Sequence, residues 1–79
     1  MKICVKSYHE LKPLTAGLPE GGQMELAPGD TVKTVFTRLA VPSQKKQALA
    51  IFVNGRPACL DTPLHAGDTL TFFSPLAGG

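Results

Sequence analysis

Residues 31–39, with the sequence TVKTVFTRL, contain the helical pattern that decides the fold of this chain. Their apolar side chains recur at positions i, i+3, i+4 and i+7, so they share one face of an α-helix, and we expect this face to be buried. The apolar residues are Val32, Val35, Phe36 and Leu39. Asp30 or Thr31 can cap the start of this helix by accepting a backbone N–H of its first turn, and Pro42 is expected to end it.

Alternating apolar residues predict strands on both sides of the helix. The predicted strands are residues 2–8 and 23–27 before the helix and residues 49–53, 56–60 and 69–73 after it. Residues 13–22 are rich in proline and glycine and are predicted to be a loop. Asn54-Gly55 is typical of a type I′ hairpin turn, and Pro57 restricts the strand after it to the edge of a sheet.

The order strand, strand, helix, strand, strand, strand favours one fold class. A single helix laid across one face of a mixed five-stranded sheet buries the helical stripe and the inward-facing strand residues together. The sequence therefore predicts an α+β fold, the β-grasp or ubiquitin-like roll, as one domain over residues 1–74 with a flexible tail over residues 75–79. We expect the first and last strands to lie parallel at the sheet centre, and the helix to cover Ile3, Val5, Leu70 and Phe72.

The charge and hydropathy of the chain argue against some classes of partner. Eight basic and six acidic residues give a net charge of +2, and the basic residues are scattered along the chain. This scatter argues against a nucleic-acid partner. No apolar run approaches the ~18 residues of a membrane span, so we expect no membrane segment and a cytoplasmic protein.

The sequence contains no recognisable catalytic or metal-binding group. His9 and His65 are isolated, which makes a metal or general-base role improbable. Asp61 and Asp68 lie in predicted turns, where carboxylates commonly accept backbone N–H groups. We therefore expect no metal, no bound cofactor and no enzyme activity in this chain itself.

The two cysteines, Cys4 and Cys59, are expected to be small, buried or half-buried apolar residues. They lack the C-x-x-C spacing of zinc and redox sites. The predicted strand order separates them by two strands, or roughly 14 Å, which is too far for a disulfide.

The chemically distinctive feature is the C-terminal pair Gly78-Gly79. Two residues without a Cβ can pass through a narrow channel in a partner and bring the α-carboxylate of Gly79 to a nucleotide phosphate. Activation as an acyl-adenylate makes such a carboxylate a good electrophile for a sulfur or nitrogen nucleophile. The chain has no ATP-binding motif, so ATP would be bound and used by an activating partner.

The last third of the chain resembles the MoaD/ThiS family of sulfur-carrier proteins. The resemblance lies in Val53-Asn54, Asp61, Pro63-Leu64, Gly67-Asp68, Phe72-Phe73, Pro75 and Ala77-Gly78-Gly79. It implies that Gly79 is adenylated by an enzyme of the ubiquitin-activating type and converted to a thiocarboxylate. It also implies a sulfurtransferase or cysteine desulfurase as the source of the sulfur.

The resemblance leaves the pathway open. In the molybdopterin branch the carrier is the small subunit of molybdopterin synthase and works with a large subunit, whereas in the thiamine branch it serves thiazole synthase. Phe72-Phe73 and the long segment between the first two strands resemble the molybdopterin branch. Three features depart from that branch: Ser74, a compact middle between Leu39 and Leu49, and a loop over residues 13–22 where the branch has a first helix. A ubiquitin-like protein modifier and a non-catalytic β-grasp binding module are the alternatives.

The residues around the tail are the candidate partner-binding residues. If Phe72 lies in the core, strand alternation places Phe73 on the opposite face, where a half-exposed aromatic side chain can anchor a partner. Pro75 stiffens the tail, and Leu76 and Ala77 are expected to contact the channel that receives it.

Overall fold

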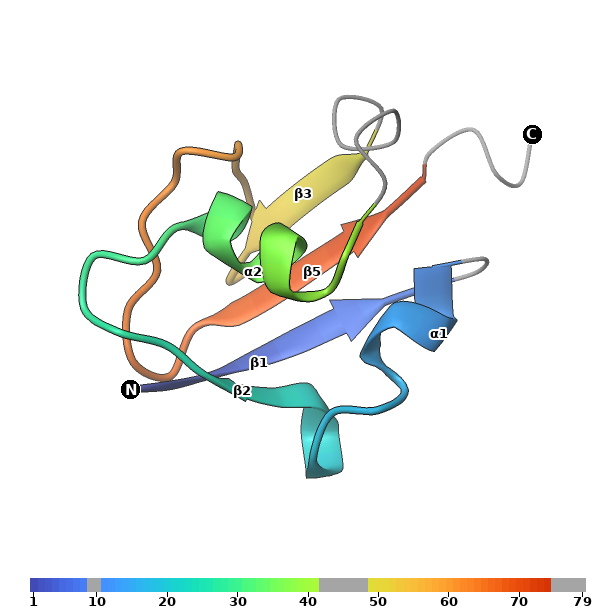
Figure 1. Cartoon of the computed structure of the whole chain (residues 1–79). Helices are drawn as coiled ribbons and strands as arrows, with labels where there is room; N and C mark the ends of the chain where they lie inside the picture. Colours follow the sequence, from blue (N-terminus) through green and yellow to red (C-terminus); the bar gives the residue numbers. More distant parts are fainter. Residues whose placement is uncertain (9–10, 42–48, 75–79) are drawn as a thin grey trace.

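The computed structural model describes residues 1–8, 11–41 and 49–74, and in these ranges five strands form one mixed sheet with α2 across one face (Figure 1). The strands are β1 (Lys2–Ser7), β2 (Gln23–Glu25), β3 (Ala50–Val53), β4 (Arg56–Pro57) and β5 (Thr69–Phe73). The helices are α1 (Lys12–Thr15), the short 3-10 helix η2 (Glu20–Gly22) and α2 (Val32–Arg38). The fold is the predicted α+β β-grasp.

The sheet has the order β2–β1–β5–β3–β4, which confirms the predicted strand arrangement. β1 and β5 are parallel neighbours, with Val5 opposite Leu70 and Ser7 opposite Phe72. β2, β3 and β4 each join the sheet by antiparallel pairing. The final strand therefore lies between two partners, at the centre of the sheet.

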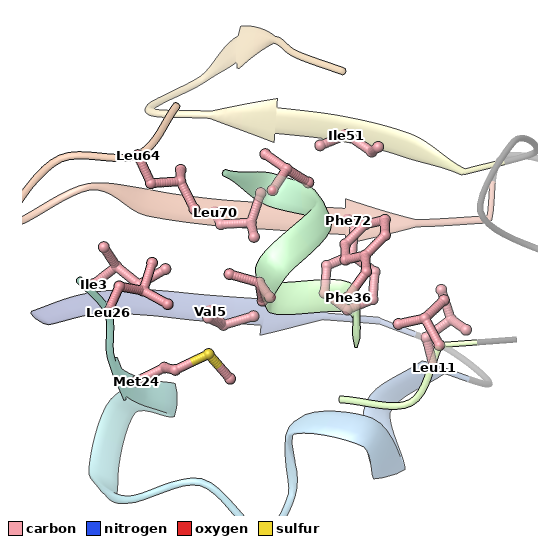
Figure 2. Packing of buried hydrophobic residues seen from close by; sticks show 13 residues of the cluster. Ile3, Val5, Leu11, Met24, Leu26, Phe36, Ile51, Leu64, Leu70 and Phe72 are labelled. Carbon is pink, nitrogen blue, oxygen red and sulfur yellow. The ribbon is translucent and has the colours of Figure 1, made fainter. Parts of the chain in front are cut away.

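The apolar stripe of α2 forms the middle of the core (Figure 2). Val32, Val35 and Phe36 are fully buried, and Leu39 is partly buried against the same cluster. The rings of Phe36 and Phe72 meet edge to face, with centroids 4.9 Å apart. This contact confirms that the helix packs over the inward residues of β5, as its spacing predicts.

The start of α2 is capped by Thr31, one of the two predicted candidates. The Thr31 N–H donates to Thr34 Oγ1 at 3.2 Å, which satisfies a backbone group at the helix entry. Asp30 acts elsewhere, because its carboxylate accepts the Ala27 N–H and closes the preceding turn.

The end of α2 differs from the prediction, because the helix stops before Pro42 is reached. Leu39 is the C-cap, and Ala40 adopts a left-handed conformation with a φ of +57°. The N–H of Val41 then donates to the Phe36 carbonyl and that of Ala40 to the Thr37 carbonyl, the hydrogen-bond pattern of a Schellman motif. Burial of Val41 favours this reversal, and Pro42 itself lies outside the described residues.

The prediction of a loop over residues 13–22 was wrong, because α1 and η2 occupy much of this segment. Pro13 lies in the first turn of α1. Backbone N–H groups in the first turn have no acceptor within the helix, so proline, which lacks an N–H, costs no helical hydrogen bond here. The buried Ser7 hydroxyl donates to the Leu11 carbonyl at 2.9 Å and lies 2.9 Å from Thr15 Oγ1, so it fixes α1 to β1. Leu11, 2% exposed, adds an apolar anchor to the core.

The β3–β4 hairpin has the predicted turn but a shorter second strand. Asn54 and Gly55 have φ values of +53° and +81°, as a type I′ turn requires. β4 pairs over Arg56 and Pro57 only, and it lies at the sheet edge as Pro57 predicts. The strand ends early because the chain turns at Cys59–Thr62, where the Thr62 N–H donates to the Cys59 carbonyl.

Candidate functional site

β5 is the element that leads into the predicted tail. It pairs with β1 on one side and β3 on the other, so its last residue, Phe73, is held at the centre of the sheet. The predicted site residues Pro75, Leu76, Ala77, Gly78 and Gly79 lie outside the described residues. The surface around the end of β5 is therefore the part of the candidate site whose geometry is defined.

Phe73 lies on the sheet face opposite α2 and is half-buried, as its alternation with the buried Phe72 predicts. Its ring stacks on that of Phe52, with centroids 6.0 Å apart and an angle of 4° between the planes. We call this pair, Phe52 and Phe73, the aromatic platform. The stacking restricts the orientation of both rings and presents aromatic surface next to the start of the tail.

Phe52 is the residue of this surface that the sequence analysis missed. The alternation that turns Ile51 toward the core also turns Phe52 outward, so this part of the signal is present in the sequence. What brings it to Phe73 is the register of β3 on β5, with Ala50 opposite Phe73 and Phe52 opposite Thr71. The two aromatic residues are thus diagonal neighbours on adjacent strands.

The register also places the neighbours of the platform on the open sheet face. Pro57 of the edge strand pairs with Phe52, and Lys6 pairs with Thr71 on the other side of β5. Cross-strand partners share a face, so the platform has an apolar residue toward β4 and a lysine toward β1. Tyr8, 44% exposed, follows directly after β1.

Several residues that carry the family resemblance have structural roles. Asn54 Nδ2 donates to Asp68 Oδ1 at 2.9 Å, and Asn54 Oδ1 accepts the Thr69 N–H at 2.9 Å, so this pair joins the hairpin turn to the start of β5. Asp68 Oδ2 accepts the His65 N–H, as predicted for a turn carboxylate. Gly67 has a φ of +85°, which a residue with a Cβ rarely adopts.

Metal-ligating side chains do not cluster within the described ranges. The His65 side chain is 79% exposed, with Nδ1 3.9 Å from an Asp68 carboxylate oxygen, and His9 lies outside the described residues. The helices described for this chain are all too short, or too polar, to span a membrane.

Both cysteines are free, but they differ in exposure. Cys4 is half-buried as expected, whereas Cys59 is exposed, so the expectation of burial was wrong for this residue. The cause is the turn after β4, in which the Cys59 N–H donates to Thr62 Oγ1 at 3.0 Å and the Cys59 sulfur lies 3.5 Å from the same hydroxyl. A hydrogen bond from Thr62 stabilises the thiolate and lowers the pKa of Cys59.

The model of the ThiS family matches residues 10–79 of this chain. A search of curated proteins gave no match. The solved structure of SAMP1, small archaeal modifier protein 1, from Haloferax volcanii aligns with a TM-score of 0.77 at 21% identity and covers 100% of both chains.

Two further solved structures share the fold. A Pyrococcus furiosus protein described as molybdopterin converting factor subunit 1 has a TM-score of 0.72 at 23% identity, covering 96% of this chain and 99% of its own. The Helicobacter pylori 26695 complex of subunits 1 and 2 of molybdopterin-converting factor contains a chain with a TM-score of 0.62 at 23% identity and 100% coverage of both chains. Likeness at these identities shows the shared β-grasp fold.

Proposed function

We propose that this chain, which belongs to the ThiS family, is a sulfur carrier that acts through the carboxylate of Gly79. The observation that carries the proposal is the extent of the family match, which runs over residues 10–79 and so includes Gly78-Gly79. The carboxylate oxygen would attack the α-phosphate of ATP on a ubiquitin-activating-type enzyme and release pyrophosphate. Attack on the acyl-adenylate by the terminal sulfur of an enzyme persulfide would then release AMP and form an acyl disulfide. A second thiol would cleave the S–S bond, which leaves the thiocarboxylate on Gly79 and a disulfide on the sulfur donor.

The folded domain supports this function by positioning the tail. β5 is paired on both sides, and Leu70 and Phe72 anchor it in the core with 0% exposure each. The position from which the tail leaves is therefore fixed, while the reactive group is supplied by Gly79. In this proposal ATP and the catalytic side chains belong to the activating enzyme, and a sulfurtransferase or cysteine desulfurase supplies the sulfur.

We infer that the sulfur is destined for molybdopterin and that the recipient is the large subunit of molybdopterin synthase. Two observations favour this branch. First, α1 forms where the sequence predicted a loop, so this difference between the chain and the molybdopterin branch disappears. The fold is shared with a molybdopterin converting factor subunit 1, and a second neighbour forms a complex of subunits 1 and 2. Transfer to thiazole synthase is the alternative within the family.

A ubiquitin-like modifier is the second candidate function, because the fold is shared with small archaeal modifier protein 1 over the whole chain. In that case the same acyl-adenylate would be passed to a lysine amine and would end as an isopeptide bond. A β-grasp module that only binds partners would undergo neither reaction. The three functions differ in the chemical fate of Gly79.

Reconstitution separates these functions. The full chain would be incubated with its activating enzyme, ATP and a sulfur source, and intact-protein mass spectrometry would follow the C-terminus. A sulfur carrier gives a thiocarboxylate at Gly79 that disappears when molybdopterin precursor and the large subunit are added. Isopeptide-linked products without a thiocarboxylate would identify a modifier, and an unmodified chain would contradict both.

The aromatic platform is the proposed docking surface for the activating enzyme or the large subunit. Phe73→Ala removes half of the stacked pair and should weaken complex formation by at least about 1 kcal/mol, or roughly fivefold in Kd. Thermal stability should change little, because Phe73 is outside the buried core cluster. Calorimetric titration measures the first effect, with Thr71→Ala on the same strand and face as the control. If the protein unfolds instead, Phe73 belongs to the core and the assignment is wrong.

A further inference from the structure

Two exposed side chains extend the surface around the aromatic platform on its β1 side. Ser7 pairs with Phe72, and both residues are buried. Strand alternation therefore turns Lys6 and Tyr8, on either side of Ser7, to the open sheet face that also carries Phe73. Tyr8, 44% exposed, is the one large apolar side chain that the described part of the chain leaves exposed. We call Lys6 and Tyr8 the donor pair, because an ammonium group and a phenol can both donate hydrogen bonds.

The charge of Lys6 is not balanced by a carboxylate of the described residues. Lys6 belongs to none of the ion pairs within residues 1–8, 11–41 and 49–74. Among the described strands, Glu25 is the acidic residue on the open face, and it lies opposite Lys2, ~13 Å along β1 from Lys6. The N-terminal amine binds the Glu25 carboxylate and lowers its pKa. The donor pair therefore presents a positive charge beside aromatic surface, and this combination suits an acidic partner.

The donor pair lies at the end of the sheet that leads into the tail. β1 and β5 are parallel neighbours and run toward the same end of the sheet (Figure 1). A protein that receives the tail must approach this end, where it meets the donor pair together with the aromatic platform. Both functions proposed above that use Gly79 begin with its adenylation. The activating enzyme is therefore the partner that these functions share.

We propose that the activating enzyme binds this surface through an acidic residue next to an apolar one, with the carboxylate on Lys6 and Tyr8 and the apolar side chain on the aromatic platform. This rests on the proposed function, because the activating enzyme is the partner. Residues two apart on a strand are roughly 7 Å apart, so one carboxylate can contact both members of the donor pair. The aromatic surface supplies most of the affinity, and the donor pair selects an acidic partner and speeds its association.

The test is a calorimetric titration of the full-length chain with its activating enzyme in the absence of ATP, so that a nucleotide phosphate cannot be the acceptor. Lys6→Glu replaces attraction by repulsion and should raise Kd at least about fivefold. Lys2→Glu makes the same change of charge on the same strand and face, but more than a Debye length from Lys6, and should change Kd less than about twofold. Tyr8→Phe keeps the ring and removes the hydroxyl, and should raise Kd roughly threefold. Added salt should weaken binding of the unmodified chain more than binding of Lys6→Gln.

The outcomes separate this surface from the chemistry at Gly79. An unchanged Kd for Lys6→Glu, with a native-like amide spectrum, would overturn the assignment of the donor pair. Equal weakening by Lys6→Glu and Lys2→Glu would also overturn it, because net charge alone would then explain the effect. Thiocarboxylate formation by the unmodified chain tests the proposed function independently. If the thiocarboxylate forms while Lys6→Glu binds normally, the donor pair alone is wrong, whereas a chain that gives neither a complex nor a thiocarboxylate would contradict both.

Discussion

Gly22 shows how closely the start of β2 approaches β1. It has a φ of +75°, and a Cβ at this position would overlap the carbonyl oxygen of Val5, a backbone atom that cannot rotate away. We predict that Gly22→Ala costs about 3 kcal/mol of unfolding free energy, from the left-handed φ and the displaced backbone together. Gly21→Ala is the matched control, because its φ is +74° with no atom within 4 Å of the added Cβ. Its cost should be about 1 kcal/mol. Equal losses in urea unfolding would contradict the close approach.

Cys59 is the residue whose chemistry depends most directly on one neighbour. Thr62 Oγ1 accepts the Cys59 N–H, which leaves its own proton free for the sulfur. Thr62→Val removes that donor, so the pKa of Cys59 should rise and its thiolate fraction near neutral pH should fall. The rate of alkylation by iodoacetamide, followed across pH by peptide mass spectrometry, measures the shift. Cys4 in the same molecule is the internal reference. An unchanged pH profile for Cys59 would exclude Thr62 as the cause.

Among the elements, α2 carries an identifiable strain at its end. Ala40 occupies the left-handed position of the Schellman motif with a φ of +57°, where glycine has no steric penalty. Ala40→Gly should therefore stabilise the protein by roughly 0.5–1 kcal/mol, since relief of the strain exceeds the extra backbone entropy of the unfolded chain. Chemical unfolding checks this prediction. A loss of stability would mean that residue 40 leaves the left-handed region in solution.

The elements whose bounds the sequence predicted best are those with enough residues to show a period. Val32, Val35, Phe36 and Leu39 define more than one helical turn, and β5 alternates over its whole length. α1 has four residues and starts with Lys12-Pro13, so its composition resembles a loop and no apolar period can develop. β4 was predicted too long because the turn after Pro57 depends on the hydroxyl of Thr62, a contact that hydropathy does not reveal.

At the scale of the whole molecule, contacts between strands determine which candidate residues meet. The exposure of Phe73 follows from local alternation and was predictable, but its stack on Phe52 requires the β3–β5 register. Asn54 and Asp68 were identified by resemblance, and their mutual hydrogen bond shows that they stabilise the fold. The resemblance therefore covers residues with structural roles as well as the proposed functional residues, and the three-dimensional arrangement identifies Asn54 and Asp68 as structural.

The central claim is that the α-carboxylate of Gly79 is the functional group of this protein. The measurement that tests it is intact-protein mass spectrometry of a variant with one residue added after Gly79, in the reconstituted sulfur-transfer reaction. The addition moves the carboxylate by one Cα spacing, about 3.8 Å, and a misplacement of even ~1 Å can cost a reaction about 100-fold. We predict a folded protein that acquires no sulfur, as should also hold for deletion of Gly79. Thiocarboxylate formation on the extended variant at the normal rate, without removal of the added residue, would contradict the claim.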